Sequence, residues 1–386
     1  MLPRIRFILL GSSLVLLLCD STIARTIVVH PGGSIRAALA QAGSGDRVQV
    51  LPGVYHEGSQ GDLNAITIAA SGIELVGLSS RTRPVVLENA GNQAFGIWVS
   101  PSDSMGAGSE ADPEHPPCGL SGARINGFSL SGFTVRGFGE DGVHLACIDG
   151  FALTNNVVDG SGVYGFFPVA SHNGFVSNNE VMNTAMDAAI YVGQSDRVLI
   201  AANRVHDNLL GIEVENSRNC SVVANEVHGN TIGIIVDIMP FLEIGTQQNT
   251  FVSLNRVHDN NRANTAEAGD PLGALPAGIG ILLVGADTTT ITANTVTGNQ
   301  YVGIGVVSFC LEAALLGLPC DGLDIEPQSD SNRVSENLVQ GNGTVPLPDP
   351  LLDALRADLT WDGTGSGNCW KANAFGTSVP SLLPSC

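Results

Sequence analysis

A short pattern of polar and apolar positions returns along the chain between residues 133 and 342. Each cycle contains an asparagine two positions before an aliphatic residue, at Asn156, Asn179, Asn203, Asn225, Asn255, Asn294 and Asn337. The first spacings are 23, 24 and 22 residues, and the later ones are 30, 39 and 43. A second asparagine stands five residues after each of the last five anchors, at Asn208, Asn230, Asn260, Asn299 and Asn342. Such a period is the signature of a solenoid built from stacked repeats.

Each cycle has the composition of strands and turns. Short runs of Val, Ile, Phe and Thr alternate with polar residues, and Asn, Gly, Asp and Ser bound these runs. No cycle holds a helical pattern long enough for a pair of helices. Three short strands fit each coil, so the sequence predicts an all-β, single-stranded parallel β-helix with coils about 4.8 Å apart. Stacked asparagines can hydrogen-bond along such a stack. A loop-rich β-sandwich is the alternative.

Alignment of the coils on their asparagines predicts which side chains face outward. Alternation places Val143, Phe166, Ile190, Ile212 and Ile234 inside the coil. One outward column then contains Trp98, His144, Phe167, Tyr191, Glu213, Ile235 and Leu282. The neighbouring column contains Ala146, Val169, Gly193, Glu215, Asp237 and Val284.

The pattern also predicts the domain organisation. Residues 25–386 are expected to form one domain, because a solenoid grows by repetition. Residues 25–56 are the expected N-terminal cap, in which Ser34 is a good N-cap for a short helix. Residues 57–345 are the coils, with insertions at 101–124, 261–277 and 309–331, and residues 346–386 are a C-terminal tail.

Residues 1–24 resemble a secretory signal peptide. Arg4 and Arg6 precede an apolar run at residues 7–18, and small residues up to Ala24 form a cleavage site. The run is short for a membrane span, and no other run is long enough. We therefore expect a secreted or periplasmic protein without a transmembrane anchor.

The net charge of the chain limits the classes of partner that it can bind. The formal charge is −20, and it becomes −21 when residues 1–24, with Arg4, Arg6 and Asp20, are removed. Such a charge excludes nucleic acid and anionic membranes as partners. We expect a monomer.

A secreted chain permits disulfides, and seven cysteines remain after the leader. We pair Cys310 with Cys320 inside one insertion, and Cys369 with Cys386 at the tail. Cys118 and Cys147 are a third candidate pair, because a loop from one coil can reach the next. Cys220 is then left over, buried and inert.

The outward columns carry the candidate chemistry. Aromatic residues are 5% of the chain, yet three of them share one column with a histidine and lie near three carboxylates. Sugars stack on aromatic faces, so the columns predict a saccharide groove. The expected roles are proton transfer for His144, Tyr191 and Glu213, sugar binding for Trp98, Phe167, Glu215 and Asp237, and Ca²⁺ binding for Glu213, Glu215 and Asp237. Ordinary stacking of aromatic residues across a sheet is the alternative.

Three histidines form another column. His206, His228 and His258 each stand three residues after an anchor asparagine, on successive coils. Stacked imidazoles can bind a transition metal, but they are equally explained as turn residues that face solvent.

The repeats resemble those of the pectate-lyase-like superfamily, from about Gly96 to Asn342, and residues 31–55 are similar to its N-terminal cap. The resemblance implies a right-handed coil. The functions it implies are those of polysaccharide lyases, hydrolases and epimerases, or of the periplasmic copper-loading accessory proteins of nitrous oxide reductase.

One stretch is similar to a catalytic motif of that superfamily. Residues 164–170 resemble the Tyr-Gly-Phe-Asp-Pro-His-Asp motif of periplasmic mannuronan C5-epimerases. Phe167, Val169 and Ala170 stand where that family has its Asp, His and final Asp. Phe and Val provide neither the base nor the acid that proton abstraction requires, so the epimerase chemistry does not carry over.

Two functions follow from these observations. The protein binds and processes a polysaccharide in the groove, by lyase-like or epimerase-like chemistry, or it is a non-catalytic binding or structural module. A copper-accessory function is a further alternative. The negative charge disfavours a polyuronate ligand unless Ca²⁺ bridges the two.

Overall fold

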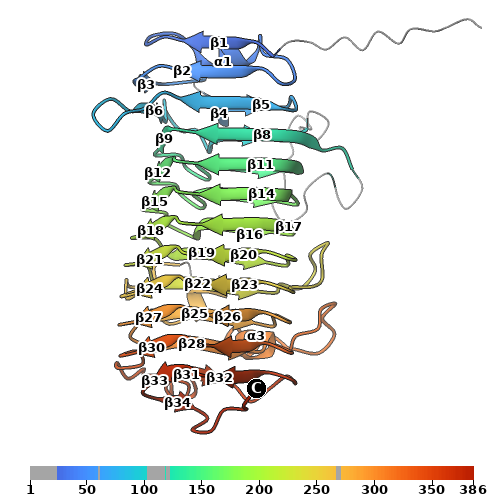
Figure 1. Cartoon of the computed structure of the whole chain (residues 1–386), viewed down its shortest axis with the longest axis vertical. Coiled ribbons are helices and arrows are strands. Elements are labelled where there is room, and N and C mark those ends of the chain that lie inside the picture. The colour runs from blue at the N-terminus through green and yellow to red at the C-terminus, as the bar shows by residue number, and fades with distance from the viewer. Residues whose placement is uncertain (1–23, 60, 102–117, 119–121, 267–270) are drawn as a thin grey trace, which may run out of the picture.

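The protein is a right-handed parallel β-helix, and the predicted fold class is confirmed (Figure 1). The computed structural model describes residues 24–59, 61–101, 118, 122–266 and 271–386. The expected leader, up to residue 23, and most of the insertion at 101–124 lie outside the described residues. Three parallel sheets run along the stack, and each coil adds a strand to each sheet.

The strands are short, and each pairs with its equivalent in the next coil. The first sheet contains β1 Thr26–Val29, β2 Arg47–Val50, β5 Ile73–Gly77, β8 Ile125–Ser131, β11 Ile148–Thr154, β14 His172–Ser177, β17 Asp196–Ala201, β20 Ser221–Val223, β23 Phe251–Ser253, β26 Thr290–Thr292, β29 Arg333–Ser335 and β32 Cys369–Lys371. The second sheet contains β3 Gly53–Tyr55, β6 Val85–Glu88, β9 Phe133–Arg136, β12 Val157–Asp159, β15 Glu180–Met182, β18 Arg204–His206, β21 Glu226–His228, β24 Arg256–His258, β27 Thr295–Thr297, β30 Leu338–Gln340 and β33 Ala374–Phe375. The third sheet contains β4 Asn64–Ile68, β7 Phe95–Val99, β10 Val143–Ala146, β13 Phe166–Val169, β16 Ala188–Gly193, β19 Leu210–Glu215, β22 Ile232–Asp237, β25 Ile279–Val284, β28 Val302–Val307, β31 Ala357–Trp361 and β34 Ser378–Val379.

A short helix, α1 (Ile35–Leu39), covers the N-terminal end of the stack. The Ser34 hydroxyl accepts the N–H of Ala37 at 3.1 Å and donates to the Glu57 carboxylate at 2.7 Å. Ile35 is fully buried against the first coils. The predicted N-cap is therefore confirmed, and the exposed core end of a solenoid is closed, as its stability requires.

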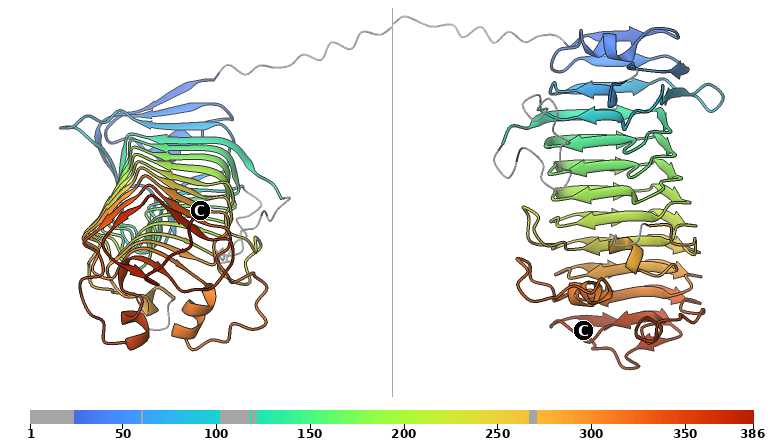
Figure 2. Two further views of the ribbon diagram at one scale, coloured as in Figure 1. Left: turned by 60° about the horizontal axis from the view of Figure 1, so that its bottom comes forward. Right: turned by 180° about the vertical axis from the view of Figure 1, so that it is seen from behind.

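Three further helices were not expected from the sequence. They are α2 (Pro271–Ala274), α3 (Phe309–Leu315) and α4 (Pro350–Asp353) (Figure 2). Helices α2 and α4 connect the second sheet to the third, and α3 connects the third sheet to the first. Each is too short for a hydrophobic period to be recognised. Residues 357–379 of the expected tail add strands to all three sheets. In the part of the chain that the structure describes, no helix has the length and apolar character of a membrane span.

Asparagine ladders run through the turns between coils. The backbone N–H of Asn203 (2.9 Å) and its Nδ2 (3.0 Å) both donate to Oδ1 of Asn225 in the next coil. The same Nδ2 donates to the carbonyl of Val176 at 2.8 Å. The second ladder ends at Asp358, whose Oδ1 accepts from Nδ2 of Asn342 at 3.0 Å. Each amide thus satisfies buried groups of both coils, which explains why one residue type returns at one position.

We expect the substitution Asn225→Ala to lower the free energy of unfolding by about 1–3 kcal/mol, because the buried N–H of Asn203 and the carbonyl of Ile200 lose their partner. Chemical denaturation measures this change. Asn92→Ala, at an exposed position, is the matched control and should unfold as the wild type does. Equal stability of Asn225→Ala and the wild type would remove the structural role of the ladder.

The three cysteine pairs predicted from the sequence are confirmed. Disulfides join Cys118 to Cys147, Cys310 to Cys320 and Cys369 to Cys386. Cys220 is a free, buried thiol, and burial raises its pKa to about 12, so it is unreactive.

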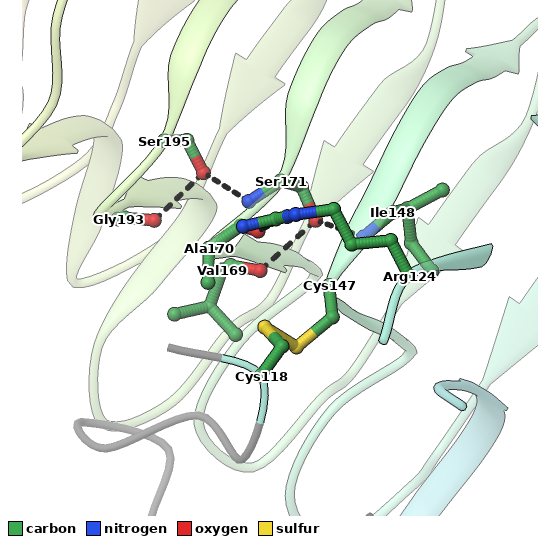
Figure 3. The surroundings of a disulfide bond; sticks show 9 residues. All are labelled: Cys118, Arg124, Cys147, Ile148, Val169, Ala170, Ser171, Gly193 and Ser195. Carbon is green, nitrogen blue, oxygen red and sulfur yellow. Dashed lines mark hydrogen bonds between the residues drawn. A yellow bond between two sulfur atoms is a disulfide. The ribbon is translucent and has the colours of Figure 1, made fainter. Parts of the chain in front are cut away.

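The disulfide between Cys118 and Cys147 lies beside a serine ladder (Figure 3). The Ser195 hydroxyl accepts the N–H of Ser171 at 3.0 Å and donates to the carbonyl of Gly193 at 2.7 Å. Ser171 makes the equivalent pair of bonds one coil earlier. The turn that enters the first sheet is thereby fixed at the edge of the third sheet, which carries the candidate site.

Candidate functional site

The outward columns of the third sheet have the predicted register. His144 of β10 pairs with Trp98 of β7 and with Phe167 of β13. Tyr191 of β16 pairs with Glu213 of β19, which pairs with Ile235 of β22. In the neighbouring column, Gly193, Glu215, Asp237 and Val284 pair in turn. These pairings agree with the register predicted from the aligned coils.

The aromatic members form one continuous stack. The His144 ring lies 3.8 Å from that of Trp98 at an interplanar angle of 2°, and 5.0 Å from that of Phe167. The rings of Phe167 and Tyr191 are 4.5 Å apart. Nδ1 of His144 is 2.8 Å from Oδ2 of Asp141, and burial raises the pKa of this aspartate. The rings of Trp98 and Phe167 thus cover both faces of the His144 ring.

The expectation that this column forms an open groove is wrong. Trp98 is 7% exposed, His144 3%, Phe167 2% and Tyr191 5%. Phe167 and Tyr191 belong to a second apolar cluster outside the coils, which also includes Leu272 of α2 and Phe309 of α3. Rings that are covered on both faces cannot serve as sugar platforms in this conformation.

The C-terminal half of the column is apolar and closely covered. Leu282, Gly305 and Thr360 line a cavity of about 30 Å³, together with Leu311 of α3 and Leu352 of α4. This volume holds no more than about two water molecules, so the cavity has no room for a sugar ring.

The carboxylates of the two columns form a tight cluster. Ligand oxygens of Glu213, Glu215 and Asp237 lie within 4.8 Å of one another. Glu213 and Asp237 are each 6% exposed, and Oε2 of Glu213 and Oδ1 of Asp237 are buried without a hydrogen-bond partner. Glu215 accepts the Tyr191 hydroxyl at 2.6 Å. The donors are all oxygen atoms, which are the ligands that Ca²⁺ prefers.

Burial and mutual repulsion raise the pKa values of these carboxyl groups. Burial, first, and then the charges of Asp187, Asp237 and Glu215 raise the pKa of Glu213 well above its usual value. Burial and the charges of Glu215 and Glu312 do the same to the pKa of Asp237. The pKa of the Tyr191 phenol is also raised well above 10, by burial and by Glu215 and Glu213. Tyr191 therefore stays protonated at neutral pH and is a poor base.

The histidine column has the predicted alignment but not convergent ligand atoms. His206 pairs with His228, and His228 pairs with His258. The rings stack with centroids 5.1 Å apart in both steps. Imidazole lone pairs lie in the ring plane, so parallel rings do not point at one shared atom. Among the described residues, only two groups gather three possible ligand atoms within 4.8 Å, and both are purely acidic: the cluster of Glu213, Glu215 and Asp237, and that of Asp287, Glu326 and Asp330.

Several residues near the site were missed from the sequence. Asp141 and Tyr164 each stand three positions before a column member, and Tyr164 donates its hydroxyl to Asp187 at 2.8 Å. Extending the aligned columns by three residues would have found both. Glu312 is 7% exposed and comes from α3 inside an insertion, where the repeat provides no alignment.

Comparisons with known proteins agree with this architecture. A family model described as "Periplasmic copper-binding protein (NosD)" matches residues 115–271. A search of curated protein sequences returned no match. The A-module of mannuronan C-5 epimerase AlgE4 from Azotobacter vinelandii has a similar structure, with a TM-score of 0.57 and 14% identity over 89% of this chain and 94% of that chain.

Two other solved structures are similar to a comparable degree. A mutant DFA-IIIase from Arthrobacter chlorophenolicus A6 has a TM-score of 0.55 and 14% identity, over 91% of this chain and 83% of that chain. ORF18 of Geobacillus virus E2 has a TM-score of 0.55 and 13% identity, over 88% of this chain and 59% of that chain. At this identity the likeness concerns the fold alone, which is a parallel β-helix.

Proposed function

We propose that the protein is a secreted or periplasmic, non-catalytic β-helix module that binds Ca²⁺ at Glu213, Glu215 and Asp237 and, through this ion, an acidic polysaccharide. The observation that carries the proposal is the pair of buried carboxylate oxygens, on Glu213 and Asp237, that have no hydrogen-bond partner. The three disulfides fit an oxidising compartment outside the cytoplasm.

A bound cation would neutralise the buried negative charge of this cluster. An unpaired buried carboxylate is strongly unfavourable, and the cluster places several of them side by side. Ca²⁺ takes six to eight oxygen ligands at about 2.3–2.6 Å and accepts irregular geometry. Three carboxylates do not complete such a shell, so further oxygen atoms come from water or from a ligand. An acidic sugar offers carboxylate and hydroxyl oxygens for these positions.

The charge of the protein makes the cation necessary for such a ligand. A chain with a formal charge of −20 repels a polyuronate unless a cation lies between them. The similar AlgE4 module is described as a mannuronan epimerase, which supports an acidic polysaccharide as the ligand class. A small movement of the side chains over the cluster would be needed to admit it, because Glu213 and Asp237 are buried.

The same face lacks a favourable set of proton-transfer groups. Phe167 and Val169 occupy the positions of the epimerase acid and base. His144 is covered on both faces by Trp98 and Phe167, and the raised pKa of Tyr191 opposes formation of a phenolate. These features favour binding over catalysis.

Equilibrium binding to polymannuronate, polygalacturonate and a neutral glucan tests the proposal. We expect both polyuronates to bind in Ca²⁺ and to bind at least tenfold more weakly in a chelator, with the neutral glucan unbound in either. The double variant Glu213→Gln/Asp237→Asn should bind as weakly as the wild type in chelator. The control Glu74→Gln, at an exposed position of the first sheet, should bind normally.

Two results would contradict this function. Polyuronate binding that is equally strong in Ca²⁺ and in chelator would exclude the bridging ion. Formation of an unsaturated product at 235 nm, or of C5-epimerised residues detected by NMR, would show that the protein is an enzyme.

A further inference from the structure

We infer that the outer face of the first sheet is an interface through which two copies of this chain form a symmetric dimer, with their stacks antiparallel. The strands of this sheet lie side by side along the whole stack (Figure 1). The monomer expected from the sequence thereby becomes a dimer. The calcium site takes no part in it, because that site lies on the third sheet.

One outward column of this face is apolar and exposed at its centre. Strand pairing aligns Ala152, Phe175, Leu199, Ser221 and Phe251 on five successive coils. Phe175 is 52% exposed and Phe251 is 41% exposed, although phenylalanine is among the side chains most often buried. Large apolar side chains that gather on one exposed face mark an interaction surface.

The centre of the face carries no charge, on a chain whose formal charge is −20. Over the seven strands from β8 to β26, this column and the column two positions further along each strand contain only Ser, Thr, Ala, Val, Leu and Phe. Asp149, Asp196 and Arg197 lie at the beginnings of β11 and β17, on the rim of the face. Two such acidic chains repel each other, so an uncharged face is where they can approach most closely. An uncharged centre with a charged rim is also the usual anatomy of a protein interface.

A two-fold axis along β17 brings large side chains opposite small ones. Each strand then faces the strand that lies equally far from β17 on the other side, in the other copy. Leu199 meets Leu199 at the axis. Phe175, one strand before the axis, faces Ser221, one strand after it. Phe251, two strands after the axis, faces Ala152, two strands before it. Such alternation of large and small side chains is what close packing of two sheets requires.

The same axis places opposite charges together at the two ends of the column. Glu74 of β5 and Arg333 of β29 end the uncharged stretch, equally far from β17 on opposite sides. Antiparallel stacks therefore put Glu74 of each copy opposite Arg333 of the other. Within its own chain Glu74 contacts Arg47 at 3.5 Å, and its side chain stays 51% exposed. Glu74 and Arg333 of one chain are about 38 Å apart, so they interact only between copies.

The size of the face predicts a dimer of moderate stability. From β5 to β29 it is about 38 Å long, and strands of three to seven residues make it about 10–23 Å wide. Each copy thus offers on the order of 400–900 Å², against roughly 800 Å² per partner in a standard specific interface. Salt should strengthen the dimer, because it screens the repulsion between two acidic chains and the exposed ion pairs contribute little.

Sedimentation velocity of the purified protein in a chelator, over an approximately hundredfold range of concentration, tests the interface. The wild type should pass from monomer to dimer as the concentration rises. Leu199→Lys should raise the dissociation constant of the dimer at least tenfold, because two ammonium groups would meet at the axis. This substitution reduces the net negative charge of the chain, so a nonspecific electrostatic effect would change the dissociation constant in the opposite direction.

Charge reversal at the two ends tests the antiparallel orientation. Glu74→Arg and Arg333→Glu should each weaken the dimer several-fold, because like charges then face each other at both ends. The double variant Glu74→Arg/Arg333→Glu should restore the wild-type affinity, and only contact between copies explains such a rescue over about 38 Å. The neutral change Glu74→Gln removes only a weak rim ion pair and should dimerise nearly as the wild type does.

Leu338→Lys, which changes an exposed leucine on β30 of the second sheet, is the matched control and should dimerise normally. Cooperative thermal unfolding of each variant at a concentration where it is monomeric shows that its fold is intact. Three results would overturn the inference: a wild type that stays monomeric at every concentration, equal effects of Leu199→Lys and Leu338→Lys, or a double charge variant no tighter than the single ones. Neither Ca²⁺ nor polysaccharide is present in this experiment, so its failure leaves the proposed function standing.

Discussion

In the presence of a chelator, the protein should unfold at a lower temperature at pH 8 than at pH 5, and Ca²⁺ should remove most of this difference. Burial and neighbouring carboxylates raise the pKa of Glu213 and of Asp237 above their values in an unfolded chain. The folded state therefore holds protons that the unfolded state releases. The stability that these groups contribute is fully present below the unfolded pKa values, near pH 4, and is lost as the pH rises through the raised folded values.

Thermal unfolding at both pH values, with and without Ca²⁺, measures the effect. Ca²⁺ at about 100 times its dissociation constant should add about 2.7 kcal/mol to the free energy of unfolding at pH 8, because it binds only the folded cluster. In Glu213→Gln/Asp237→Asn, the unfolding temperature in chelator should rise at pH 8 and should no longer respond to Ca²⁺, since the buried charges are gone.

A small pH dependence should remain in that variant. Burial raises the pKa of Asp287 to about 6, and this group acts with the same sign in the same pH range. Glu74→Gln, the exposed control, should behave as the wild type does. A wild type with the same unfolding temperature at pH 5 and pH 8, and with no response to Ca²⁺, would contradict both the cation site and the strained carboxylate cluster.

The substitution Gly233→Ala should destabilise the fold by about 3 kcal/mol or more. A Cβ atom at this position would lie 2.4 Å from the carbonyl oxygen of Gly280 and 2.7 Å from Cγ1 of Val257. The carbonyl belongs to the backbone of the next coil. Relief of the clash therefore requires the two coils to separate, which would strain the hydrogen bonds between β22 and β25.

Chemical denaturation of Gly233→Ala beside Gly91→Ala checks this expectation. An added Cβ at Gly91 meets nothing within 4 Å, so that variant should be as stable as the wild type. The equivalent position of β16 is Ala189, whose methyl group is fully buried, so the clash expected at Gly233 is specific to its contacts with Gly280 and Val257. If Gly233→Ala unfolds together with the wild type, each coil can accept a methyl group there, and close approach of the coils is not the reason for glycine.

The coil and its register could be predicted from the repeat alone. The anchor asparagines bond to their equivalents in the next coil, so one repeated residue type marks one repeated place in space. Period-two alternation then decides which side chains enter the core, because a slip of one residue would exchange inside and outside. For this reason the pairing of Tyr191 with Glu213, and of Glu215 with Asp237, was predictable from spacing alone.

The cysteine pairs were predictable for a related reason. Cys310 and Cys320 share one insertion, and Cys369 and Cys386 both lie in the tail. In each case the chain between them is short enough to bring the thiols together. Cys220 lies inside a coil, where its side chain faces the core and reaches no other cysteine.

Burial of the side chains on the outer face of the third sheet could not be predicted from the repeat. Alternation shows that Phe167 and Tyr191 leave the coil, but not whether solvent or protein receives them. Residues of α2, α3 and α4, which lie outside the repeat, pack over that face and contribute Glu312 near the carboxylates. The environment of Glu213 and Asp237 is therefore set by contacts between segments far apart in sequence, and neither the repeat nor any local preference encodes them. Burial of these carboxylates, which makes a bound cation the natural solution, is for that reason visible only in the folded chain.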